Sequence, residues 1–169
     1  MKPLAILLSS ALITFGLAHG APAPKLSDFQ TVLELARTVS LLSEIGVPFD
    51  TAQAKTLLVV LHGLDQPDAI TPNEATGLVM KLEAALRPAQ LAALTKKRQV
   101  LEVIARKRAT QARTPSTNAL TVMSWTVPGG PLIVAIIERD MKVNPFRVKG
   151  SQDAFEKLVT VLEKRVRTG

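Results

Sequence analysis

"LRPAQLAALTKKRQ" occupies residues 86–99 and repeats the pattern of two earlier stretches, "FDTAQA" at 49–54 and "ITPNEA" at 70–75. In each stretch an apolar residue is followed, three or four positions later, by Gln or Glu, with Thr or Pro between them. This order of residues is typical of the first turn of a helix, where side chains satisfy free backbone N–H groups. We therefore interpret all three stretches as helix starts, which favours an all-α fold.

The second of these stretches contains the clearest local signal in the chain, "TPNE" at residues 71–74. Thr71 can accept a hydrogen bond from the first turn, and Pro72 stands where a helix needs no N–H donor. Glu74 can reach back to the backbone N–H of Thr71, which completes a capping box. The sequence predicts a helix from here to about residue 86, which Pro88 ends or kinks. The helical pattern then resumes in a basic segment that could form a helix of about 25 residues.

Three more helices follow from apolar residues at helical spacing. One covers residues 26–45 and presents a single apolar stripe. The next runs from about residue 50 to 63, and because it is apolar on nearly all sides we expect it in the middle of the bundle. The last helix has a regular apolar stripe from Phe155 to Val166, with Ser151 as its expected cap.

Between residues 114 and 131 the helical pattern gives way to "TPSTNALTVMSWTVPGGP", which is typical of a linker. A short helix at 132–141 is the favoured interpretation of "LIVAII" and its neighbours, with a strand pair across the Pro-Gly-Gly-Pro turn as the alternative. The predicted fold is thus an all-α helical bundle of about five or six helices, with a Pro/Gly-rich linker before its C-terminal part. The predicted organisation is a signal peptide at 1–20, a helical bundle with a basic final helix at 21–113, the linker at 114–131 and a C-terminal helical segment at 132–169.

The first twenty residues, "MKPLAILLSSALITFGLAHG", have a positive start, an apolar stretch and small residues before a plausible cleavage point. These are the features of a secretory signal peptide. We expect cleavage after Gly20 and export to the periplasm, the cell envelope or the extracellular space, with no transmembrane span left in the processed chain. The chain has no cysteine, so the exported protein must be stable without disulfides.

Residues that could support catalysis or hold a metal or cofactor are few. After signal cleavage the only histidine is His62, which we interpret as a helix-end residue that helps to satisfy terminal carbonyls. There is no zinc-binding spacing of His and Glu, and the glycines at 129–130 are flanked by prolines rather than followed by the lysine of a phosphate loop. We therefore predict a non-enzymatic protein with no cofactor, no metal and no catalytic residues.

Positive charge is concentrated in the second half of the chain. Residues 21–95 contain five Lys and Arg against eight Asp and Glu, whereas residues 96–169 contain fifteen against six. Seven of these cations lie close together: Lys96, Lys97, Arg98, Arg106, Lys107, Arg108 and Arg113. Such a segment can attract nucleic acid, acidic polymers or lipid head groups. The competing interpretation is a solvated helix end whose cations complement the helix dipole, because helical spacing distributes the seven over nearly every side.

The three helix-start motifs, inside an exported and cysteine-free helical protein, resemble the Leu-Thr-x-x-Gln motifs of the Spy/CpxP-like periplasmic proteins. The matching residues are Leu86, Pro88 and Gln90 in the third motif, Ile70, Thr71 and Glu74 in the second, and Phe49, Thr51 and Gln53 in the first. None matches in full, since Arg87 stands for the threonine in one motif and Glu74 for the glutamine in another. The resemblance covers residues 26–113. It implies an ATP-independent chaperone or stress-response protein that forms a homodimer and holds clients on a basic, partly apolar face.

These observations lead to two functional hypotheses. In the first, an exported, non-enzymatic helical protein binds unfolded or partner proteins in the cell envelope. In the second, a cell-surface protein binds nucleic acid, acidic wall polymer or lipid head groups through its basic helix. The salt dependence of binding distinguishes the two hypotheses, because phosphate binding through several cations weakens steeply as the salt concentration rises.

Overall fold

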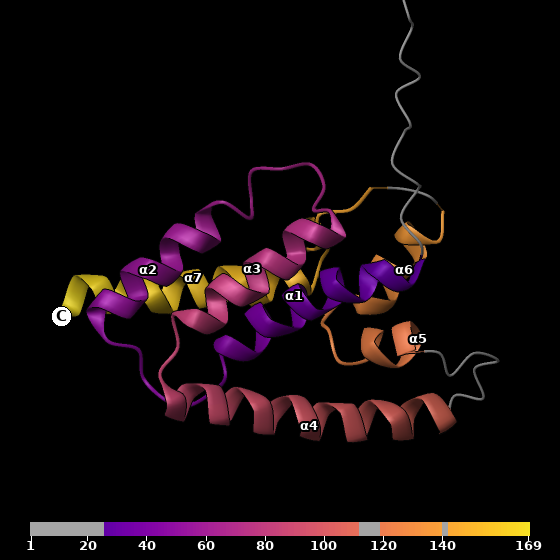
Figure 1. Cartoon of the computed structure of the whole chain (residues 1–169), viewed down its shortest axis with the longest axis horizontal. Helices are drawn as coiled ribbons and strands as arrows, with labels where there is room; N and C mark the ends of the chain where they lie inside the picture. The colour runs from indigo at the N-terminus through magenta and orange to yellow at the C-terminus, as the bar shows by residue number, and fades with distance from the viewer. Residues whose placement is uncertain (1–25, 112–118, 140–141) are drawn as a thin grey trace, which may run out of the picture.

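The computed structural model describes residues 26–111, 119–139 and 142–169, which form a bundle of helices (Figure 1). In chain order its elements are η1 (Leu26–Phe29), α1 (Gln30–Leu42), α2 (Thr51–His62), α3 (Pro72–Ala84), α4 (Pro88–Gln111), α5 (Ala119–Ser124), α6 (Gly130–Ile137), η2 (Pro145–Arg147) and α7 (Ser151–Thr168). No strand occurs within these ranges. The prediction of an all-α helical bundle is confirmed, with seven α-helices in the described ranges rather than five or six.

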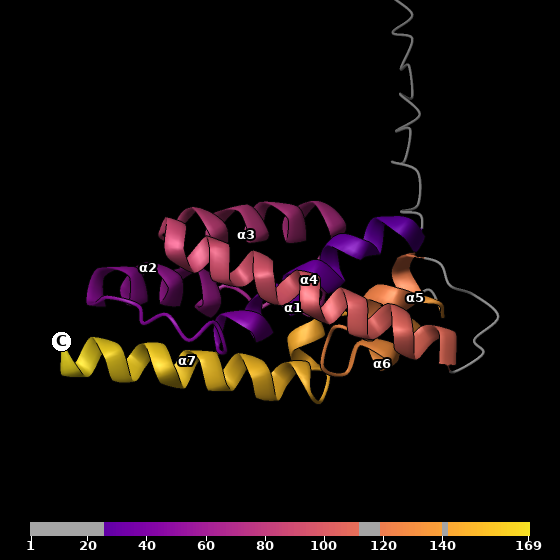
Figure 2. The ribbon, with the colours of Figure 1, turned by 90° about the horizontal axis from the view of Figure 1, so that it is seen from below.

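Helix α1 lies at the centre of the bundle and contacts α3, α4, α5 and α7. Figure 2 shows it between α3 on one side and α7 on the other. Ten of its thirteen residues are buried, including Arg37 and Thr38. We expected α2 to be the central helix, and that prediction was wrong. Only Ala54, Leu57 and Leu61 of α2 are buried, while Val59 is 76% exposed.

The polar side chains of α1 explain why this helix, and not α2, can be buried. Thr38 Oγ1 donates to the carbonyl of Glu34 at 2.8 Å, one turn earlier on the same helix. Arg37 forms an ion pair with Glu34, also on α1. Because a buried polar group is costly only when it lacks a partner, these local pairs lower the cost of enclosing α1. Arg37 Nε is the exception, since it is buried without a hydrogen-bond partner in the described chain.

The capping box predicted at Thr71 is present, and a second one, which was not predicted, is present at Asp50. Asp50 accepts from the backbone N–H of Gln53 at 2.7 Å, and Thr71 accepts from that of Glu74 at 3.3 Å, with the return hydrogen bond present in each case. Ser151 is not the cap that we expected for α7. It lies inside the helix, and its hydroxyl donates to the carbonyl of Pro128.

Gly150 caps α7 because two stretches of backbone meet closely there. Its φ is +94°, and a Cβ at this position would lie 2.9 Å from the backbone nitrogen of Gly129. Gly129 has a φ of +73°, and its own Cβ would lie 2.4 Å from the carbonyl oxygen of Lys149. Only glycine fits both the left-handed conformation and the close approach. This contact joins the turn before α6 to the start of α7.

The stretch that we predicted as a linker contains a helix. Helix α5 (Ala119–Ser124) and the first residues of α6 fall within residues 114–131, and residues 114–118 lie outside the described residues. The strand alternative is wrong, because both apolar segments are helical. Leu120 of α5 and Ile133, Val134 and Ile137 of α6 belong to the same hydrophobic core as α1 and α2.

The C-terminal segment also closes over the end of α2. Asn144 Nδ2 donates to the carbonyls of Leu64 and Pro67, both at 2.8 Å, and the rings of Phe146 and Phe155 lie 5.3 Å apart. Helix α7 then runs along α2 and α1. In the described part of the chain no helix combines the length and the apolar character needed to cross a membrane.

Candidate functional site

Two of the three repeated motifs contact each other directly. Gln53 in the first turn of α2 donates from Nε2 to Oε1 of Gln90 in the first turn of α4, at 2.8 Å. Gln90 also donates to the carbonyl of Pro48 at 3.0 Å and accepts from the backbone N–H of Arg87 at 2.8 Å. Its side chain is fully buried. This glutamine therefore caps α4 and ties that helix start to α2.

The remaining motif residues also have structural roles. The apolar residues Phe49, Ile70 and Leu86 are all buried in the core. Thr71 and Glu74 form the capping box of α3, and Pro88 is the first residue of α4. The motifs are thus helix starts, and the polar side chains of the motifs at 49–53 and 86–90 are directed toward each other rather than toward solvent.

The seven cations predicted as a binding segment divide into groups with different surroundings. Arg98 turns into the bundle, where its Nη1 lies 2.7 Å from Glu83 Oε1 on α3 and its Nη2 donates to Thr38 Oγ1 at 2.7 Å. Its Nε lies 3.0 Å from Glu34 Oε1 as an ion-pair contact without an aligned hydrogen bond. Arg98 is therefore a structural residue that joins α1, α3 and α4, and it is not available to a ligand.

Two further cations are paired nearer the surface. Arg106 donates to Glu102 at 2.7 Å, one turn earlier on α4, and this pair holds the pKa of Glu102 below its ordinary value. Lys97 Nζ lies 3.7 Å from Glu44 Oε2 at the end of α1. The seventh cation, Arg113, lies outside the described residues. Exposed pairs of this kind contribute little to stability, so Lys97 and Arg106 can exchange partners at small cost.

The other three cations, Lys96, Lys107 and Arg108, are exposed and make no ion pair within the described chain. At 3.6 residues per turn they fall on one side of α4, within roughly 120° of its circumference, together with Lys97 and two apolar residues. We call this side the α4 flank, and its members are Lys96, Lys97, Val100, Ile104, Lys107 and Arg108. No acidic residue of α4 lies on it, because the only one, Glu102, is on the opposite side.

The apolar members of the α4 flank are unusually exposed. Val100 is 52% exposed and Ile104 is 41% exposed. Beside them is a surface hollow of about 380 Å³, which Leu41, Glu44 and Ile45 line from α1 and its end, and Ala93, Lys96, Lys97, Val100 and Leu101 line from α4. Along this side of α4, two exposed apolar side chains thus lie between two pairs of cations, beside a mainly apolar depression.

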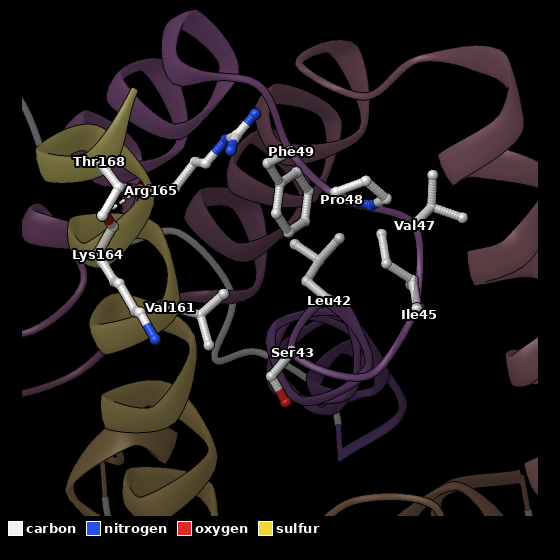
Figure 3. Close-up of a pocket in the computed structure, with 11 residues that line it drawn as sticks. Leu42, Ser43, Ile45, Val47, Pro48, Phe49, Val161, Lys164, Arg165 and Thr168 are labelled. Carbon is white, nitrogen blue, oxygen red and sulfur yellow. Dashed lines mark hydrogen bonds between the residues drawn. The ribbon is translucent and has the colours of Figure 1, made fainter.

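A second hollow lies on the other side of Ile45, between the connection from α1 to α2 and the last turns of α7. It has a volume of about 410 Å³. Its walls are mainly apolar, and Lys164 and Arg165 of α7 are its charged residues (Figure 3). Leu42, Ser43, Ile45, Gly46, Val47, Pro48, Phe49, Val161, Lys164, Arg165 and Thr168 line it. The sequence analysis did not find this hollow, because its two walls come from segments more than one hundred residues apart.

The described residues contain no group of three or more His, Asp or Glu that could hold a metal ion. His62 is exposed at the end of α2, where it makes no hydrogen bond with the described chain. Our interpretation of His62 as a partner for terminal carbonyls was wrong, because its ring donates to no carbonyl of the described chain. The loop carbonyls after α2 instead accept from the side chains of Asn144 and Arg147. The pKa values of Asp50 and Glu74 are lowered chiefly because backbone N–H groups of Gln53 and Thr71 donate to them.

Comparison with protein-family models, with curated proteins and with solved structures finds no match for this chain. The resemblance of its three motifs to those of the Spy/CpxP-like proteins therefore remains a prediction. The α4 flank and the two apolar hollows are the features on which a functional proposal can rest.

Proposed function

We propose that this chain is an exported, non-enzymatic protein that binds unfolded or partner proteins in the cell envelope through the α4 flank. One observation carries this proposal: Val100 and Ile104 are exposed between four cations, beside the hollow of about 380 Å³. Exposed apolar residues that gather next to a depression are typical of protein-binding surfaces. The cations favour client segments in which acidic and apolar residues alternate.

The two sides of α4 have different surroundings, one packed against the buried helix α1 and the other exposed. One side holds Arg98 against Glu34 and Glu83, so it fixes the helix to the bundle. The other side carries Lys96, Lys107 and Arg108, which form no ion pair with any residue that the structure describes. A helix that is rigidly held on one side and left uncovered on the other can present side chains without first having to fold.

The place of action rests on the sequence. The signal peptide at residues 1–20 lies outside the described residues, and it is the ground for proposing export to the periplasm, cell envelope or extracellular space. The homodimer that the family resemblance implies is part of the same proposal. Sedimentation equilibrium of the processed protein measures its molecular mass and tests for the dimer.

The test uses light scattering from an aggregating client protein. Val100→Asp combined with Ile104→Asp places two charges on the α4 flank, and we expect it to abolish most of the suppression of aggregation. Val59→Asp is the matched control, because Val59 is 76% exposed and lies within α2 rather than α4. Equal activity of all three proteins would show that the α4 flank is not the client-binding surface.

The alternative function, binding of nucleic acid, acidic wall polymer or lipid head groups, is favoured by the unpaired Lys96, Lys107 and Arg108. Three cations on one side of a helix can contact successive anionic groups of a polymer. Lys96→Gln, Lys107→Gln and Arg108→Gln together should then remove binding to a fluorescent anionic oligomer, whereas Val100→Asp should weaken it only through its charge. A full loss in the triple variant, with client suppression intact, would favour this alternative.

A further inference from the structure

The hollow of about 410 Å³ beside α7 is lined mainly by apolar residues and by two cations, Lys164 and Arg165. Leu42, Val161 and Phe49 surround the space, and Figure 3 shows the side chain of Arg165 extending across it toward Phe49. Its volume lies within the range of small-molecule sites, roughly 300–1,000 Å³. We propose that this hollow binds a free fatty acid, with the apolar chain between α7 and the α1–α2 connection and the carboxylate at Lys164 and Arg165.

The charge of the lining residues favours an anion. Lys164 and Arg165 are the charged residues of the hollow, and no Asp or Glu lines it. Asp50 does not line the hollow, and the charge of Arg165 contributes only a minor part of the lowering of its pKa. Its main partners are Arg87, with which it is ion-paired, and the backbone N–H of Gln53. By contrast, the hollow of about 330 Å³ near Ile70 is lined by both Glu74 and Lys81, whose charges oppose each other.

The polar groups of the wall favour a lipid chain over a peptide. The Ser43 hydroxyl already donates to the carbonyl of Ser40 at 2.8 Å, and the Thr168 hydroxyl donates to that of Lys164 at 3.0 Å. A bound peptide would bring C=O groups that need donors, and neither hydroxyl has a hydrogen left to donate to them. A hydrocarbon chain has no such requirement, and it gains free energy from contact with Leu42, Phe49 and Val161.

The test measures decanoate binding by isothermal titration calorimetry and by NMR shifts, below the concentration at which the ligand forms micelles. The experiments use the processed protein, as it is obtained from the cell that produces it. We expect saturable binding of one decanoate per chain, at least about tenfold tighter than binding of decan-1-ol, because only the acid can pair with the two cations. Shifts should concentrate at residues 42–49 and 161–168.

Two variants separate the parts of the site. Lys164→Gln with Arg165→Gln should reduce decanoate affinity to that of decan-1-ol. Arg167→Gln is the matched control, because Arg167 is in the same last turn but pairs with Glu163 and does not line the hollow. Val161→Trp should fill the hollow and weaken binding of both ligands, and this residue is exposed enough to accept the larger side chain without unfolding.

Several results would overturn the proposal: no saturable decanoate binding, unchanged binding in the Lys164→Gln/Arg165→Gln variant, or equally tight binding of decyltrimethylammonium. Binding of an apolar peptide with a free C-terminal carboxylate, when decanoate fails to bind, would assign the hollow to peptides instead. The proposal is independent of the α4 flank. The Val100→Asp/Ile104→Asp variant should therefore keep its decanoate affinity whether or not it still protects a client.

Discussion

Gln53 Nε2 donates to Gln90 Oε1 across 2.8 Å, and this contact joins two helix starts that are 37 residues apart in the chain. Arg87 and Asp50, from the same two motifs, also form an ion pair. The polar residues of the two motifs thus join the start of α2 to the start of α4. The repeated pattern therefore has a structural meaning that is independent of any family resemblance.

Substitution of Gln90 should destabilise the fold. Gln90→Ala removes the acceptor of the Arg87 N–H and the donor to the Pro48 carbonyl, and it leaves Gln53 without its side-chain acceptor. Unsatisfied buried groups cost roughly 1–3 kcal/mol each, so we expect a loss of about 2–4 kcal/mol in the free energy of unfolding. Urea titration followed by circular dichroism measures it. Gln99→Ala, an exposed glutamine of the same helix, should change stability by less than about 0.5 kcal/mol.

Arg98 should matter far more than its neighbour Arg106. Arg98→Met leaves the carboxylates of Glu34 and Glu83 facing the space that the guanidinium occupied. Loss of one partner of a buried ion pair costs about 3–5 kcal/mol, and because this network is partly exposed we expect about 2–3 kcal/mol. Arg106→Met, which breaks an exposed pair on α4, should cost less than about 0.5 kcal/mol. Similar losses in both variants would contradict the central position assigned to Arg98.

The cap at Asp50 makes stability depend on pH. The backbone N–H of Gln53, with help from Arg87, holds the pKa of Asp50 below its ordinary value of 3.8 in the folded protein. A carboxyl whose pKa is lowered on folding stabilises the protein above its unfolded pKa, and this contribution is lost as the pH falls through the folded pKa. Asp50→Asn retains a good cap but cannot titrate. The urea concentration at the unfolding midpoint of this variant should therefore fall less steeply below about pH 4 than that of the unsubstituted protein. The same pH dependence in both proteins would contradict the role assigned to Asp50.

Export should leave a shortened chain. When the full gene is expressed in a bacterium, we expect the protein outside the cytoplasm with an intact mass that lacks residues 1–20. N-terminal sequencing should begin at Ala21. A full-length chain in the cytoplasmic fraction would remove the basis for placing the protein in the cell envelope.

Local features of the fold could be predicted from the sequence because their causes are local. The capping boxes at Asp50 and Thr71 depend on residues three positions apart, and both are present. The apolar stripe of α7 likewise gave its buried residues Phe155, Leu158 and Leu162. Helical spacing and cap chemistry are sufficient for such predictions.

Features that depend on distant pairing could not be predicted. The position of Arg98 follows from Glu34 and Glu83, and neither the hydropathy nor the spacing around residue 98 specifies those partners. The central position of α1 likewise follows from its contacts with α3, α4, α5 and α7, which the periodicity of residues 30–42 does not specify. Helix α5 was missed because Pro, Gly, Ser and Thr surround a segment of only six residues, whose helix is stabilised by core contacts such as that of Leu120.

A salt series of client aggregation tests the proposed function most directly. The processed protein is mixed with an aggregating client at near-stoichiometric amounts, and light scattering is recorded from about 50 mM to about 200 mM salt. Over this range, phosphate binding through three or four cations weakens roughly 40- to 150-fold. We predict suppression that persists across the series, because Val100 and Ile104 provide salt-insensitive apolar contacts. Absence of suppression at every salt concentration would contradict the account of the α4 flank as a client-binding surface.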